Sequence, residues 1–69
     1  MRFRSADHIR AEHVGRRVTI RRRIEGGGTG DVIGILRSVG PDDLRVLRAD
    51  GTDVHILRGD VVAARLITE

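Results

Sequence analysis

Arginine is the residue type in this chain with the clearest chemical potential. Arg17, Arg21 and Arg23 alternate with other residues along one short segment, and Arg16 stands at its start. The guanidinium group is a planar fork that binds phosphate through two parallel hydrogen bonds. Three interpretations of this arginine stripe are open: a solvated face, an interface with a protein domain, or a surface for nucleic acid.

Aromatic content helps to weigh these interpretations. The chain has one phenylalanine and neither tryptophan nor tyrosine. Small barrels that bind nucleic acids usually stack bases on aromatic side chains. Aromatic cages and grooves for proline-rich peptides need such side chains as well. The composition therefore favours a solvated face or a protein interface over a nucleic-acid surface.

A glycine-rich segment follows the stripe. Residues 23–28 have the arrangement Arg-x-x-Gly-x-Gly, which is typical of loops that hold the pyrophosphate of coenzyme A. Such a loop works with a helix N-terminus behind it. Residues 29–33 are instead typical of a strand. We therefore expect a hairpin turn here and no bound cofactor.

Histidines and acidic residues offer two further candidates. His8 and His13 are five residues apart, so they do not share a helix face with Glu12 in the spacing of a zinc site. The acidic pairs at residues 42–43 and 50–53 fall in turns, where water prevents the pKa shifts that acid–base catalysis needs. We expect neither a metal site nor a catalytic residue, and hence no enzyme activity in this chain.

Length and composition exclude several classes of protein. With 69 residues, the chain can build one small core and cannot form a two-domain enzyme. It has no cysteine and no long apolar run, so we expect no disulfide, no membrane contact and a cytoplasmic location. All 13 basic residues are arginine, which hints at a GC-rich genome; the net charge is +3.

Most of the chain has the pattern of short β-strands. Valine, isoleucine and threonine occur in short runs separated by glycine and aspartate clusters. A short helix with Gly15 behind it is expected near the N-terminus, and one helical turn capped by Asp60 near the C-terminus. The sequence predicts a helix at 5–13, strands at 16–24, 31–39, 44–48, 53–57 and 64–67, and a turn at 60–62.

Alternation assigns the faces of these strands. Gly34, in the middle of a strand, indicates a bend or a close backbone approach. Arg22 interrupts the inner face of its strand and is expected near a barrel mouth or a bend. Thr19 is placed outward with the arginine stripe. The positions predicted to face inward are Val18, Ile20, Ile24, Val32, Gly34, Leu36, Leu44, Val46, Val54 and Ile56.

Five short strands of this kind close most readily into a small barrel. We predict an all-β fold, an SH3-like five-stranded barrel with a short N-terminal helix and a single helical turn before the last strand. Residues 1–13 are expected to form the N-terminal arm, and residues 14–69 the barrel.

Four segments carry a resemblance to a known family: residues 15–23, 31–36, 48–52 and 60–65. Together they resemble the SH3-like domain at the N-terminus of certain actinobacterial GNAT-superfamily N-acetyltransferases, a group described as histone-acetyltransferase-like. The resemblance spans residues 14–67. It implies an accessory barrel, followed in such proteins by an acetyltransferase domain whose catalytic residues have no counterpart here.

These observations lead to a docking hypothesis. We expect a non-catalytic interaction module whose partner is a protein domain, either the acetyltransferase domain or a second copy. The alternative is a small nucleic-acid-binding barrel that uses the arginine stripe. The candidate interaction surface combines the stripe with apolar residues that alternation places outside: Arg16, Arg17, Arg21, Arg23, Ile33, Ile35 and Leu47.

Overall fold

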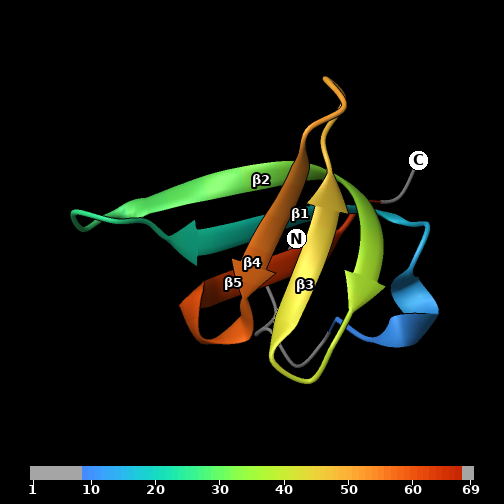
Figure 1. Cartoon of the computed structure of the whole chain (residues 1–69), viewed down its shortest axis with the longest axis horizontal. Helices are drawn as coiled ribbons and strands as arrows, with labels where there is room; N and C mark the ends of the chain where they lie inside the picture. Colours follow the sequence, from blue (N-terminus) through green and yellow to red (C-terminus); the bar gives the residue numbers. More distant parts are fainter. Residues whose placement is uncertain (1–8, 68–69) are drawn as a thin grey trace.

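The computed structural model describes residues 9–67 and is almost entirely β-structure (Figure 1). A single antiparallel sheet has the strand order β4-β3-β2-β1-β5. The predicted all-β, five-stranded fold is confirmed. In chain order the elements are η2 (Ala11–His13), β1 (Arg17–Arg23), β2 (Thr29–Val39), β3 (Asp43–Leu47), β4 (Asp53–Leu57), η3 (Arg58–Asp60) and β5 (Val61–Leu66).

The sheet folds over on itself around one core. Figure 1 shows β3 and β4 crossing in front of β1 and β5 at a steep angle, with the long strand β2 shared by both halves. The inward-facing side chains of all five strands meet between these halves. The core consists of Ile9, Val18, Ile20, Val32, Leu36, Leu44, Val46, Ile56 and Ala64, with Val39, Val54, Val61 and Leu66 packed against it.

Most of the inward positions predicted from alternation are confirmed, but two positions differ. Ile24 is 44% exposed because β1 ends at Arg23 and Ile24 already belongs to the hairpin turn, where its N–H donates to the Gly28 carbonyl. Thr19 is only 5% exposed, although its parity places it outside. It lies between Ile33 of β2 and Arg65 of β5, whose side chains share the outer face with it.

The two predicted helical segments also differ from the structure. Residues 5–8 of the predicted N-terminal helix lie outside the described residues, and residues 9–13 hold only the 3-10 turn η2. Arg10 has an extended backbone, and its N–H donates to His13 Nδ1 at 2.9 Å. The turn therefore begins only at Ala11, later than the predicted helix. The second turn comes earlier than predicted, so Asp60 ends it and does not cap it. Val61 and Val62 are β-branched and enter β5.

The predicted close approach at Gly34 is confirmed. Gly34 lies opposite Val18 of β1, and β3 passes close to its other side. A Cβ atom there would overlap the Leu47 carbonyl oxygen and lie 2.8 Å from the Leu47 carbonyl carbon. Only glycine lets β2 and β3 come this close. The pairing of β1 with β5 shifts register between Arg21 and Arg22, at the position where the sequence predicts a barrel mouth or a bend.

Arg58 joins three separate parts of the chain. Its Nε donates to the Gly40 carbonyl at 3.0 Å, and its Nη2 to the Ile9 carbonyl at 3.3 Å. Its own backbone N–H donates to the Asp42 carbonyl. The part-buried side chain therefore ties the segment before η2, which brings Ile9 into the core, to the β2–β3 turn and η3.

We predict that Arg58→Ala lowers the free energy of unfolding by about 2 kcal/mol, because two part-buried backbone carbonyls lose charge-assisted hydrogen bonds. Urea denaturation of the two proteins measures the difference. Arg37→Ala, on an exposed residue of β2, is the matched control and should change stability by less than about 0.5 kcal/mol. Equal effects of the two substitutions would contradict this role of Arg58.

Among residues 9–67, no helix is long and apolar enough to cross a membrane.

Candidate functional site

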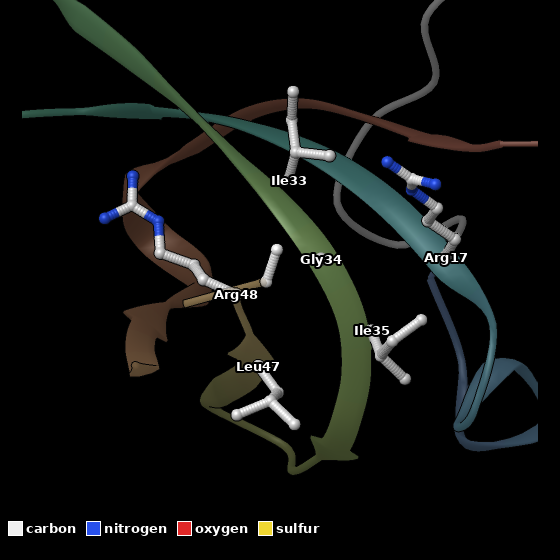
Figure 2. A pocket seen from close by; sticks show the side chains of 7 residues that line it. Arg17, Ile33, Gly34, Ile35, Leu47 and Arg48 are labelled. Carbon is white, nitrogen blue, oxygen red and sulfur yellow. The ribbon is translucent and has the colours of Figure 1, made fainter. Parts of the chain in front are cut away.

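A hollow on the outer face of the sheet brings together four of the seven predicted surface residues. It has a volume of about 510 Å³ and lies where β2 passes the end of β3 (Figure 2). Its lining residues are Arg17, Ile33, Gly34, Ile35, Leu47, Arg48 and Ala49.

Strand register explains why these side chains meet. Ile35 of β2 lies opposite Arg17 of β1 on one side and opposite Leu47 of β3 on the other. Ile33 is two residues earlier on β2 and therefore shares the outer face with Ile35. The side chains of Ile33 and Ile35 are 48% and 38% exposed, so the hollow has an aliphatic floor that is open to solvent.

Figure 2 shows the two arginines of the hollow on opposite sides of β2. Arg17 lies on the side of β1, and Arg48 lies on the side where β3 ends. Sequence reasoning placed Leu47 at this site but missed Gly34, Arg48 and Ala49. The sequence signal for Arg48 and Ala49 was the Asp50-Gly51 turn, which marks the end of β3. The chain turns there, and the N–H of Arg48 donates to the Thr52 carbonyl at 2.8 Å.

The other arginines of the stripe do not line the hollow. Arg21 binds the carboxylate of Asp31 through two contacts, Nε to Oδ1 at 3.0 Å and Nη2 to Oδ2 at 3.4 Å. Arg23 donates from Nη1 to the Gly59 carbonyl at 2.9 Å. Arg16 is exposed and precedes β1. The predicted stripe is therefore divided, because the guanidinium groups of Arg21 and Arg23 contact other parts of the same domain and lie outside the hollow.

Two exposed carboxyl groups have pKa values below their ordinary value. The hydrogen bond from Arg21 holds the pKa of Asp31 below its ordinary value of 3.8. The backbone N–H of Thr52 donates to Asp50 Oδ1 at 2.9 Å, and this bond likewise lowers the pKa of Asp50. Both side chains are therefore stabilised in their charged form, Asp31 by an ion pair and Asp50 by a hydrogen bond within a turn.

These shifts predict an acid-sensitive fold. A carboxyl group whose pKa is lower in the folded state stabilises the protein above its ordinary pKa, and this contribution is lost as the pH falls through the lower folded value. The free energy of unfolding should therefore decrease on acidification below about 3.8. Asp31→Asn combined with Asp50→Asn should make this decrease shallower in urea titrations at a series of pH values. An unchanged slope would contradict the assignment.

The histidines and remaining acids form local contacts. His55 Nε2 lies 2.6 Å from Asp43 Oδ2 across β3 and β4, and both side chains are partly exposed. His13 Nε2 lies 4.0 Å from the Glu12 carboxylate. His8, the third residue of that candidate, lies outside the described residues. Within residues 9–67, no three histidine or acidic side chains are grouped so that they could hold a metal ion.

Comparison with known proteins identifies the family. The family model described as "Rv0428c N-terminal Sm-like domain" matches residues 12–65, which is most of the chain. The chain belongs to this family. No curated protein and no solved structure matches it. The small barrel predicted as SH3-like is therefore an Sm-like domain. In this domain, the matched region contains every residue that lines the hollow.

Proposed function

We propose that this Sm-like domain is a non-catalytic docking module, the cytoplasmic accessory N-terminal domain of a GNAT-type N-acetyltransferase. The observation that carries the docking role is the hollow itself. Ile33, Ile35 and Leu47 gather on the outer face of the sheet and lie outside the domain's own core. A cluster of aliphatic side chains on an outer face is typical of a surface that another protein covers.

Two observations support the accessory role. The family is named for a domain at the N-terminus of a protein, which fits a module attached to a further domain. The segments that resemble the acetyltransferase-linked barrel include residues 31–36 and 48–52, and these two segments supply most of the hollow's lining. The proposed partner is therefore the acetyltransferase domain of the same protein.

The first test is the coding sequence beyond Glu69 together with the intact mass of the protein from its source. The proposal expects a larger product with an acetyltransferase domain after the barrel. A specific protease site placed after Glu69 in that product then tests docking. After cleavage, the barrel should still elute with the remainder in size-exclusion chromatography. A product that ends at Glu69 overturns the accessory role, and separation after cleavage overturns docking.

The alternative function is nucleic-acid binding through Arg16, Arg17, Arg21 and Arg23. The observation in its favour is the concentration of arginine in residues 16–23. Against it stand the contacts of Arg21 with Asp31 and of Arg23 with Gly59, which compete with phosphate. The aliphatic floor of the hollow also offers no ring on which a base could stack.

A salt titration separates the two functions. Phosphate binding requires an affinity for RNA or DNA that falls steeply with salt, by about 0.9 units of log–log slope per duplex phosphate neutralised. It also requires that Arg21→Glu with Arg23→Glu weaken that affinity. The docking proposal expects neither effect. Both effects together would favour the nucleic-acid function.

A further inference from the structure

The long strand β2 has a free edge beside the hollow. Its last ladder pair with β3 is Ile35 with Leu47, so Thr29 to Gly34 have no strand on the β3 side within residues 9–67. Figure 1 shows this half of β2 extending past the crossing of β3 and β4, paired only with β1.

The hydrogen-bond pattern shows which backbone groups are open. Ile24 N–H donates to the Gly28 carbonyl, and Leu36 N–H donates to the Arg16 carbonyl. In an antiparallel ladder, alternate residues bond to opposite sides. The even-numbered residues of β2 therefore bond to β1. Thr29, Asp31 and Ile33 point their N–H and C=O groups to the open side, where the described residues supply no backbone partner.

The free edge and the hollow meet at Ile33. Its backbone groups point to the open side, and its side chain, 48% exposed, forms part of the aliphatic floor. A strand added to this edge would bond to the backbone of β2 and place every second side chain on the outer face beside Ile33. Backbone pairing and side-chain recognition are thus available at one place.

The charge around the hollow favours an acidic segment as the added strand. Two arginines and no acidic residue line it. Arg48 is exposed at the end of β3, next to the free edge. The nearest acids by register are Asp53, which lies opposite Leu47 outside the lining, and Asp31, which shares the outer face with Ile33 and is bound by Arg21. Asp50, in the turn after β3, also lies close to Arg48, whose charge adds to the hydrogen bond from Thr52 in lowering the pKa of Asp50. A carboxylate on the incoming strand would therefore meet a guanidinium group in a hollow whose own lining carries no negative charge.

We propose that the free edge of β2 binds an extended acidic segment of a partner protein by strand addition. An aliphatic side chain of the segment enters the hollow, and a carboxylate two residues away contacts Arg48. The proposal rests on the proposed docking function and names the chemistry of the segment that docks.

The test uses the 69-residue chain, labelled with ¹⁵N, and a blocked synthetic peptide, Asp-Thr-Leu-Thr-Asp. In the extended form, its leucine and both aspartates share one face. The peptide should shift the amide signals of Asp31, Ile33 and Leu47 and slow the hydrogen exchange of the Asp31 and Ile33 amides. Peptides with lysine in place of aspartate, or serine in place of leucine, should bind at least about tenfold more weakly.

Two further comparisons test the mode of binding. N-methylation of the leucine amide and N-methylation of a threonine amide should weaken binding to different degrees. In an extended peptide these two amides point to opposite sides, and only one of them faces the edge of β2. Arg48→Glu should reverse the preference between the acidic and lysine peptides, and Arg37→Glu, on exposed β2 outside the hollow, should not. Equal binding of both N-methylated peptides, or an unchanged preference in Arg48→Glu, overturns the proposal.

Other results of these experiments would overturn either strand addition or the docking function. Absence of any peptide-induced change at Asp31 and Ile33 overturns strand addition, as does self-association of the chain or an RNA oligomer occupying the same amides. If the cleaved full-length protein nevertheless stays together through the hollow, only the strand-addition proposal has failed. If it separates, the docking function has failed.

Discussion

Gly34→Ala is expected to remove most of the protein's folding stability. The new Cβ atom would overlap the Leu47 carbonyl oxygen and would also lie 3.0 Å from Cγ1 of Val46, which is part of the core. Backbone cannot move aside as the end of a flexible side chain can, so β2 and β3 would have to separate. We expect a loss of about 3 kcal/mol in the free energy of unfolding.

A loss of this size is most of the stability that a domain of 69 residues can draw from one core, about 3–5 kcal/mol. Circular dichroism during thermal and urea denaturation would measure it. Gly59→Ala is the matched control, because nothing lies within 4 Å of its Cβ position. This control should change stability by less than about 0.5 kcal/mol. Similar stability of both variants would show that the close approach at Gly34 is not needed.

Ile33→Asp is expected to release the barrel from its partner while leaving the fold intact. The side chain is 48% exposed and lies outside the core, so the folded domain tolerates a polar group there. In the complex, the carboxylate would be buried against Ile35 and Leu47 and lose its water. We expect the dissociation constant to rise at least about 30-fold, the effect of losing a central interface residue.

The measurement is the fraction of barrel that elutes with the remainder of the full-length protein after cleavage behind Glu69. Val62→Asp is the control, since Val62 is 44% exposed on β5 and lies outside the hollow. It also replaces a β-branched aliphatic side chain by aspartate, at a similar degree of exposure. If both substitutions release the barrel, the cause is a general effect of surface charge. If neither substitution releases it, the hollow is not the docking site.

Much of this fold could be predicted because alternation along a strand reports burial directly. Val18, Ile20 and Leu36 are buried where their parity places them. The rule fails where burial depends on a neighbouring strand or on the end of one. Thr19 is covered from β2 and β5, and Ile24 is exposed because β1 has already ended.

The site was partly predictable for the same reason. Ile33, Ile35 and Leu47 all stood out as apolar residues that alternation places on an outer face. Arg48 was missed, because the Asp50-Gly51 turn indicates where β3 ends in the sequence but not which part of β2 lies beside that end. Equally, the sequence alone could not show that Arg21 is bound by Asp31, a contact that depends on the register of β1 with β2.

Hydrogen exchange of the hollow in the full-length protein tests the docking claim most directly. Exchange of the amides in residues 29–35 and 46–49 would be followed by mass spectrometry in the full-length protein and in the 69-residue chain. We predict markedly slower exchange of these two segments in the full-length protein, with residues 61–66 unchanged. Equal exchange of the hollow segments in both proteins would show that nothing covers them and would contradict the docking function.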